Sequence, residues 1–295
     1  MPDYFAARRA LIDDYLRELS LRIPAPSVLR DPLQRALASS GKRVRGILTM
    51  TVGQAAGAKP EKLIGAAAAM EMIHTSSLIL DDLPAMDDAL LRRGQPTLHR
   101  EFGEDLAILS AVALLNHAYG LVSAAHAELS PRRWPAHQVM QRVVDAVGWD
   151  GTIAGEAVDL HVDQLGEESK LDFDTLEFIH SRKTGALFVA AAAVGGMLAN
   201  IHPAPLQRVE VFAKNLGLAF QITDDVLDVT SNPEVLGKDV GKDAQRLTFV
   251  KLAGLDGARK LSEELVETSL AAIEPLGPPA KPLRELAILV RDRVR

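Results

Sequence analysis

The amino-acid sequence predicts an all-α fold. Apolar residues recur at intervals of three and four along most of the 295 residues, and no convincing stretch shows the two-residue alternation of a half-buried strand. Apolar residues make up 47% of the chain but aromatic residues only 4%, so the predicted core is aliphatic and rich in the helix formers Ala and Leu. This length is compatible with one domain or two.

The same periodicity predicts ten helices, separated by segments rich in proline and glycine. Their approximate ranges are 3–20, 27–38, 42–57, 60–82, 105–128, 136–165, 173–199, 204–229, 246–272 and 281–294. The breaks are marked by Pro24 and Pro26, and by residues 131–135, 166–172, 202–205 and 275–282. The most apolar stretch, GALFVAAAAVGGMLA at 185–199, is shorter than the ~20 residues of a membrane span, so we interpret it as a buried core helix.

Charge and cysteine content exclude several classes of function. The chain has 33 basic and 39 acidic residues, so it lacks the broad basic field that sequence-independent binding of nucleic acid requires. It has no cysteine, which excludes disulfides, thiolate zinc sites and a cysteine nucleophile. The N-terminal segment lacks the apolar run of a signal peptide. We therefore expect a cytoplasmic protein without a membrane span.

Two clusters of aspartate follow apolar helices. The first is DDLPAMDD at 81–88, directly after LIL, and the second is TDDVLD at 223–228. Asp224 and Asp228 are four residues apart and share a helix face, with Asp225 beside them, so we expect three carboxylates within one turn. Each extra anion at a helix C-terminus is unfavourable by ~0.3–1 kcal/mol, and the apolar neighbours argue against a solvated acidic face. A bound cation would offset both costs.

Carboxylates without histidine or cysteine partners suit Mg²⁺, which takes one or two of them and completes its shell with water and phosphate oxygens. Phosphate-binding segments should therefore lie nearby, and four basic segments are candidates. They are GKRVRG at 41–46, RRG at 92–94, RKTG at 182–185 and GKDVGKD at 237–243. Each alone is typical of an ordinary surface patch, but their positions near the acidic clusters indicate a diphosphate site. The sequence contains neither a Walker A loop nor a G-x-G-x-x-G fingerprint.

From about residue 40 to residue 255 the sequence resembles the trans-isoprenyl diphosphate synthases, or polyprenyl synthetases. The two aspartate-rich motifs of that family match within HTSSLILDDLPAMDDALLRRGQPTLHREFGE and LGLAFQITDDVLD, and DDALLRRG and AILSAVALL resemble the bacterial geranylgeranyl diphosphate synthases of carotenoid pathways. The resemblance implies a single domain over 1–295, with about 10–13 mostly antiparallel helices around a deep central cavity. It also implies a homodimer and three Mg²⁺ ions per active site.

Motif matching also implies the role of each site residue. The metal ligands would be Asp81, Asp82, Asp87, Asp224, Asp225 and Asp228. The allylic diphosphate would be bound by Arg92, Lys183, Thr184, Gln221 and Lys238. Isopentenyl diphosphate would be bound by Lys42, Arg45, His74 and Arg93. The catalytic groups would be Asp81, Asp82, Lys183, Asp224 and Asp225. His74, Ser77 and Asp81 share one helix face, which is consistent with a common site.

The implied reaction needs no side-chain nucleophile. Metal ions and basic side chains make the diphosphate a better leaving group, the allylic C–O bond ionises, and the double bond of isopentenyl diphosphate attacks the cation before a proton is lost. Product length should depend on side-chain size one turn before Asp81, where Ser76 and Ser77 are both small. We therefore expect a C20 product, geranylgeranyl diphosphate, and Ser76→Phe should shorten it toward C15.

Some positions depart from the family pattern, and three other functions remain open. Ser40 and Gly46 replace the usual Gly and Pro, and Glu156 replaces a Gln. Gln245 and Arg246 replace Gly-Lys, and Arg is a poor substitute for Lys at a phosphate. The alternatives are a farnesyl diphosphate synthase, a class I terpene cyclase and a non-catalytic partner subunit of a heteromeric synthase. A second acidic motif and a second diphosphate site argue against the cyclase, and intact aspartates argue against the inactive subunit.

Overall fold

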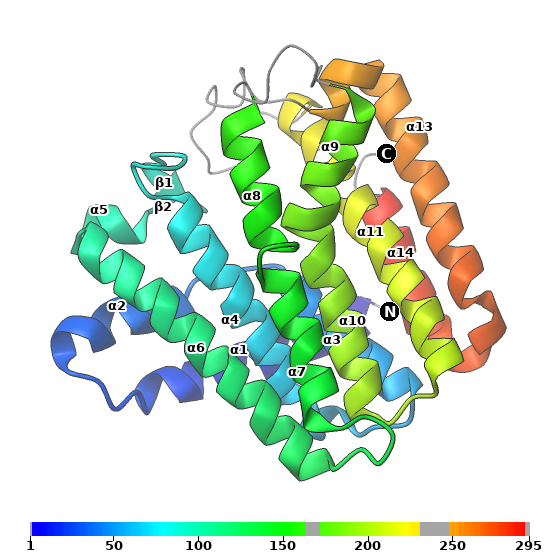
Figure 1. The fold of residues 1–295 in the computed structure, drawn as a ribbon, viewed down its shortest axis with the longest axis horizontal. Coiled ribbons are helices and arrows are strands. Elements are labelled where there is room, and N and C mark those ends of the chain that lie inside the picture. Colours follow the sequence, from blue (N-terminus) through cyan, green and yellow to red (C-terminus); the bar gives the residue numbers. More distant parts are fainter. Residues whose placement is uncertain (1, 163–171, 231–247, 293–295) are drawn as a thin grey trace.

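The computed structural model describes residues 2–162, 172–230 and 248–292, and these ranges form a bundle of helices (Figure 1). The helices are α1 (Pro2–Leu21), α2 (Ser27–Leu37), α3 (Val44–Ala55), α4 (Ile64–Asp81), α5 (Leu98–Phe102), α6 (Glu104–Leu129), α7 (Ala136–Val147), α8 (Thr152–His161), α9 (Phe173–His180), α10 (Ala186–Leu198), α11 (Pro203–Thr230), α13 (Phe249–Ile273) and α14 (Lys281–Asp292). Short 3₁₀ turns cover Pro60–Lys62, Glu274–Leu276 and Pro278–Ala280. The predicted all-α class is confirmed.

Helix α10 lies at the centre of the bundle and packs on α3, α7 and α11. Almost all of its residues are buried, which confirms that the apolar stretch at 185–199 is a core helix. Its approach to α3 requires glycine, because a Cβ at Gly195 would lie 2.1 Å from the backbone oxygen of Thr49. Helix α4 packs on α6, and α11 packs on α13. The core is aliphatic, as the composition predicted.

Three of the long predicted helices are interrupted. In the helix expected at 246–272, Gly254 breaks α13 near its start with a φ of 73°. The helix expected at 136–165 ends at Val147 and resumes at Thr152, because Gly148 adopts an extended conformation and begins a turn that Gly151 closes. The helix expected at 173–199 is α9 and α10 joined by a π-helical turn at Ser181–Gly185. Such turns occur often at functional sites, and this one carries the predicted phosphate ligands Lys183 and Thr184.

A hairpin of two short strands and the short helix α5 were not predicted. Strand β1 (Leu91–Arg92) pairs with β2 (Gln95–Pro96) in antiparallel register. The two residues between them, Arg93 and Gly94, have φ values of 55° and 74°. Two consecutive positive φ angles are typical of a tight two-residue hairpin turn. Two-residue strands are too short to produce a period-two signal in the sequence.

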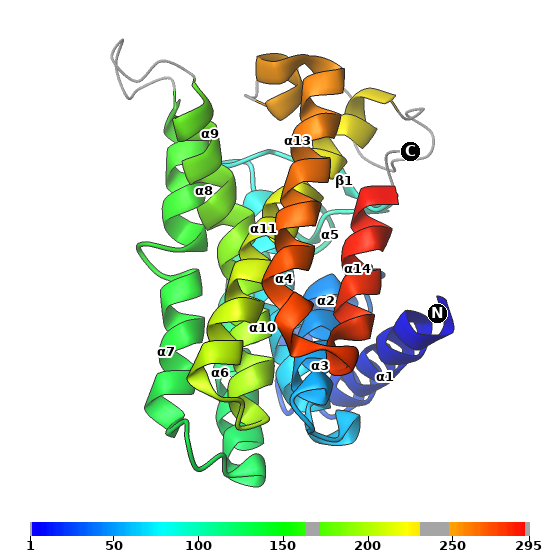
Figure 2. The same ribbon diagram turned by 90° about the vertical axis from the view of Figure 1, so that its right-hand side faces the viewer.

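The fold places both aspartate clusters at the same end of the bundle. The C-terminal ends of α4 and α11 lie at the upper end in Figure 1, close to the hairpin and to α8. Figure 2 shows α13 and α14 on one side of the molecule. Helices α6, α7 and α8 lie on another side, the one that faces the viewer in Figure 1.

Among the described residues one helix, α6, is long and apolar enough to cross a membrane by length and composition, and 33% of its apolar window is buried.

Candidate active site

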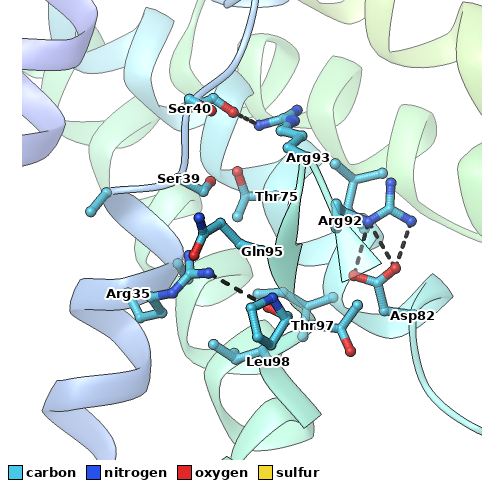
Figure 3. A pocket seen from close by; sticks show the side chains of 15 residues that line it. Arg35, Ser39, Ser40, Thr75, Asp82, Arg92, Arg93, Gln95, Thr97 and Leu98 are labelled. Atoms are coloured by element: carbon cyan, nitrogen blue, oxygen red, sulfur yellow. Dashed lines mark hydrogen bonds and ion pairs between the residues drawn. The ribbon is translucent and has the colours of Figure 1, made fainter. Parts of the chain in front are cut away.

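The first wall of the site is the C-terminal end of α4 and the segment that follows it. Asp82 is buried and forms a two-pronged ion pair with Arg92, whose Nε lies 2.7 Å and Nη2 2.6 Å from Asp82 Oδ1 (Figure 3). Arg92 lies at the end of β1, directly before the tight turn at Arg93 and Gly94. Asp81 and Asp87 are partly buried beside it. The pairing places Arg92 directly against the first acidic cluster.

The side chain of Arg93 extends away from Asp82, toward the loop between α2 and α3. Its guanidinium donates to the backbone oxygen of Ser40, in the loop between α2 and α3 (Figure 3). A cavity of about 310 Å³ lies between this hairpin, α2 and α4, and both Arg92 and Arg93 line it. The two adjacent arginines therefore contact different partners, Asp82 and the loop.

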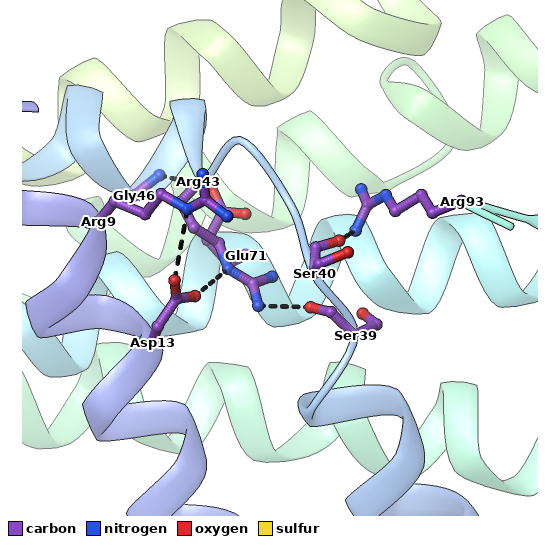
Figure 4. Close-up of polar contacts among 8 residues, drawn as sticks. All are labelled: Arg9, Asp13, Ser39, Ser40, Arg43, Gly46, Glu71 and Arg93. Atoms are coloured by element: carbon purple, nitrogen blue, oxygen red, sulfur yellow. Dashed lines mark hydrogen bonds and ion pairs between the residues drawn. The ribbon is translucent and has the colours of Figure 1, made fainter. Parts of the chain in front are cut away.

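The loop that carries GKRVRG is anchored to α1 and α4. Arg43 adopts a left-handed conformation with φ 51° and donates to Asp13 at 2.7 Å and to the backbone oxygen of Ser39 at 2.6 Å (Figure 4). The backbone nitrogen of Gly46 donates to Glu71 at 2.8 Å. A proline, the usual residue of the family here, has no such donor. The hydrogen bond to the buried carboxylate of Glu71 therefore accounts for glycine in place of proline at position 46.

Arg45 and His74 line the interior below this loop. Arg45 is buried over the ring of Phe188, 5.0 Å from its centroid. Burial lowers the pKa of Arg45 to about 10, although Glu71 and Asp224 oppose the shift. Burial, followed by the charges of Arg45 and Arg93, lowers the pKa of His74 well below its usual value. His74 is therefore neutral at pH 7 and would contribute hydrogen bonding, without charge, to an anion.

The second wall is the C-terminal half of α11. Thr184 donates to Gln221 at 3.1 Å, and Gln221 donates to Asp225 Oδ1 at 3.0 Å. Asp225 Oδ2 accepts a hydrogen bond of 3.1 Å from the backbone nitrogen of Phe249, at the start of α13. Asp224 instead lies by Lys42, 3.7 Å from its Nζ.

The three carboxylates expected within one turn have different neighbours in the structure. Asp224 and Asp225 are consecutive, so their side chains leave the helix in different directions. Asp225 is buried and bonded to α13, whereas Asp224 and Asp228 are only partly buried. Within the described ranges, no group of three or more carboxylate or imidazole side chains lies where it could hold a metal ion.

Lys183 extends from the π-helical turn between two carboxylates of α8. Its Nζ lies 2.6 Å from Glu156 Oε2 and 2.7 Å from Asp159 Oδ2. Burial alone would lower the pKa of Lys183, but the charges of Asp159 and Glu156 raise it. Burial and then the charge of Glu156 raise the pKa of Asp81 to about 7. The sequence reasoning missed Asp159, although its spacing of three from Glu156 places both on one helix face.

The two serines expected to set product length occupy different environments. Ser76 is 2% exposed and donates to the backbone oxygen of Ala111 on α6 at 2.8 Å. Ser77 is partly buried and donates to the backbone oxygen of His74 at 2.9 Å. Lys238, Gln245 and Arg246 lie outside the described residues.

The donor set fits Mg²⁺ bound together with a diphosphate. Mg²⁺ usually takes one or two carboxylates and fills its shell with water and phosphate oxygens, so it does not require three converging side chains. Burial raises the pKa of Asp225 to about 6, and Asp81 has a comparable environment. Ionised carboxylates in such positions are destabilised, and a bound cation would offset that cost. Asp82 is paired with Arg92, and Asp225 is hydrogen-bonded to the start of α13.

Comparison with known proteins agrees with this arrangement. The family model described as polyprenyl synthetase matches residues 26–271. Geranylgeranyl diphosphate synthase of Cyanophora paradoxa is 38% identical, covering 98% of this chain and 95% of that protein. An FPP/GFPP synthase from Zymomonas mobilis superposes with a TM-score of 0.85 at 29% identity, over 99% of this chain and 100% of that one.

A geranyltransferase from Helicobacter pylori, whose structure contains magnesium and isoprenyl diphosphate, superposes with a TM-score of 0.84 at 27% identity. The match covers 98% of this chain and 96% of that one. The matched region includes both aspartate clusters and every basic segment singled out from the sequence. The chain belongs to the polyprenyl synthetase family.

Proposed function

We propose that this protein is a prenyltransferase that condenses isopentenyl diphosphate with an allylic diphosphate and forms geranylgeranyl diphosphate. One observation carries the proposal: basic groups stand against both acidic clusters within one end of the bundle. Arg92 pairs with Asp82, and Lys42 lies 3.7 Å from Asp224. Relatives named geranylgeranyl diphosphate synthase support the reaction and the C20 product.

Different residues of the chain would bind the two substrates. Thr184 is hydrogen-bonded to Gln221, and Gln221 to the second acidic cluster, and both would bind the allylic diphosphate together with Lys183 and Arg92. Lys42, Arg45, His74 and Arg93 would bind isopentenyl diphosphate on the side of the α2–α3 loop. Arg45 is buried and cannot easily rearrange, so it would fix that diphosphate in position. Holding the two substrates close together converts their encounter into an intramolecular step.

Mg²⁺ would be held by Asp81 and Asp87 on one wall and by Asp224 on the other, with Asp82, Asp225 and Asp228 beside them. When bound, it would neutralise the allylic diphosphate and make it a better leaving group. The magnesium and isoprenyl diphosphate in the Helicobacter pylori relative support this assignment. Three ions per site is the number that the family resemblance implies.

A homodimer would cover the exposed apolar face of α6. Ile108, Leu109 and Val112 are 43%, 54% and 57% exposed. Trp149, in the turn between α7 and α8, and Ile153, in α8, are 95% and 57% exposed. An apolar face of this kind is typical of a protein interface. A cytoplasmic location remains a prediction.

Product analysis tests the proposed function. The purified protein is incubated with Mg²⁺, isopentenyl diphosphate and, in turn, dimethylallyl, geranyl or farnesyl diphosphate, and the products are identified by chain length. We expect a C20 product that requires Mg²⁺. A product that stops at C15 would identify a farnesyl diphosphate synthase, and no elongation with any primer would contradict the proposal. Elongation only after addition of a second protein would indicate a heteromeric subunit.

A further inference from the structure

Two cations of the GKRVRG segment stand over one pair of aromatic rings. Lys42 Nζ lies 5.3 Å from the centroid of the Phe220 ring, and the Arg45 guanidinium lies 5.0 Å from that of Phe188. The two rings contact each other, with 5.6 Å between their centroids. Lys42 and Arg45 therefore face one small region, although Lys42 precedes α3 and Arg45 belongs to its first turn.

Arg43 sets the direction of the chain between these two cations. Its φ of 51° and ψ of 34° are left-handed, a conformation that is unfavourable for a residue with a Cβ. Such a conformation persists where the surrounding structure holds it, and it is found often at ligand-binding sites. A change to an ordinary backbone conformation at Arg43 would turn Lys42 away from Arg45.

Asp13 of α1 holds the side chain of Arg43. Arg43 is 5% exposed, and its Nε donates to Asp13 Oδ1 at 2.7 Å, while its Nη2 donates to the backbone oxygen of Ser39 at 2.6 Å (Figure 4). The bond to Ser39 closes the loop on itself, whereas the bond to Asp13 connects the loop to another helix. Without Asp13, a buried guanidinium would lose its carboxylate partner, so this bond strongly favours the observed position of Arg43.

Side-chain packing does not fill the space between α1 and this loop. A groove of about 450 Å³ lies there, and Arg9, Asp13, Lys42 and Ile47 are among the residues that line it. Arg9 also contacts Asp13, at 3.4 Å, but both residues belong to α1. The bond between Asp13 and Arg43 therefore joins α1 to the loop beside a space that packing leaves open.

We propose that Asp13 is a positioning residue for isopentenyl diphosphate, because through Arg43 it keeps Lys42 and Arg45 aimed at one diphosphate. The inference rests on the proposed function, in which these two cations bind that substrate. Asp13 acts through Arg43 and not by contact with the substrate. Its loss should weaken the binding of isopentenyl diphosphate and spare the allylic substrate, whose proposed ligands lie on other segments.

Steady-state kinetics of Asp13→Ala measures the effect on each substrate. KM for isopentenyl diphosphate should rise about tenfold or more, because a small misplacement of binding groups is costly. The value of kcat at saturation and KM for the allylic substrate should stay within about threefold of the wild type. Asp13→Asn keeps an oxygen that can accept from Arg43, so it should raise KM for isopentenyl diphosphate less than Asp13→Ala does.

The next residue of the same helix provides a matched control. Asp14 pairs with Arg17 at 2.8 Å, and its side chain is 58% exposed. Asp14→Ala should leave all three kinetic constants unchanged. A double-mutant cycle shows whether Asp13 acts through Arg43. Glycine adopts the left-handed conformation without strain, so the cycle uses Arg43→Gly, and Asp13→Ala should cause no further rise in that background.

Hydrogen exchange measured by mass spectrometry gives a readout that needs no substrate. The segment 38–46 should exchange faster in Asp13→Ala than in the wild type, and at the wild-type rate in Asp14→Ala. If Asp13→Ala does not fold, as judged by its melting curve, Asp13→Asn is held to the same direction of change in both exchange and KM.

Three outcomes would overturn the inference. They are a KM for isopentenyl diphosphate within about threefold of the wild type in Asp13→Ala, an equal rise in KM for both substrates, and unchanged exchange of segment 38–46. A wild type that forms no product would instead contradict the proposed function. In that case hydrogen exchange still decides whether Asp13 fixes the loop, so the two failures are distinguishable.

Discussion

The side-chain nitrogen of Lys42 lies 3.7 Å from the carboxylate of Asp224. These residues belong to the basic loop before α3 and to the second acidic cluster on α11. Their proximity means that a diphosphate bound by the loop would be within reach of the metal held by the cluster. Since the Lys42 side chain is 61% exposed, this ion pair contributes little to stability and can separate when substrates bind.

Asp224→Asn should reduce the rate of condensation about 10²–10³-fold, the usual cost of losing one group that stabilises developing charge. The fold should be unaffected, because Asp224 is only partly buried. Incorporation of labelled isopentenyl diphosphate measures the rate. Asp256→Asn is the control, since Asp256 is fully exposed on α13. A rate within about threefold of the wild type for Asp224→Asn would remove this residue from the site.

Asp81→Asn should stabilise the metal-free protein at pH 8. The pKa of Asp81 is raised from 3.8 to about 7, so the protonated form is favoured in the folded state, and stability is lost as the pH rises toward 7. Asparagine resembles the protonated form at every pH. Denaturant unfolding in EDTA should show a gain of about 1–3 kcal/mol at pH 8 and a smaller gain at pH 5. A gain that is equal at both pH values would show that Asp81 is not destabilised by its charge.

Gly46→Pro should destabilise the protein by about 1–3 kcal/mol, because it removes the donor to the buried carboxylate of Glu71. Proline is tolerated in the first turn of a helix, but a Cβ at this position would lie 2.9 Å from the backbone oxygen of Ala67, so steric contact adds to the effect of the lost hydrogen bond. A double-mutant cycle with Glu71→Met isolates that bond. The cost of Gly46→Pro should shrink in the Glu71→Met background. An unchanged cost would mean that the proline acts through steric contact, for instance with Ile12.

Ser77→Phe should shorten the product toward C15 with little loss of stability. Ser77 is partly buried on the α4 face that carries His74 and Asp81. Ser76→Phe should also shorten the product, but it should destabilise the protein by about 1–3 kcal/mol because Ser76 is packed against α6. Product chain length and melting temperature are measured for both variants. If Ser76→Phe alone shortened the product, the growing chain would pass on the α6 side of α4.

The periodicity of the sequence was sufficient to predict most of the helices and the burial of α10, but not the short helix α5 or the breaks at Gly148 and at Ser181–Gly185. It did not predict the hairpin at residues 91–96, because a two-residue turn at Arg93 and Gly94 depends on local φ angles. The residue types identified both acidic clusters, but they did not reveal that Asp225 bonds to Phe249. That contact joins segments that are distant along the chain. The carboxylate pair around Lys183 was missed for the same reason, although the spacing of Glu156 and Asp159 is visible in the sequence.

A crystal structure with Mg²⁺ and inorganic pyrophosphate tests the central claim most directly. We expect pyrophosphate between α4 and α11, together with Mg²⁺ ions that take oxygen ligands from both Asp81 and Asp224. Pyrophosphate bound away from these two helices, or metal bound at only one of the two aspartate clusters, would contradict the account.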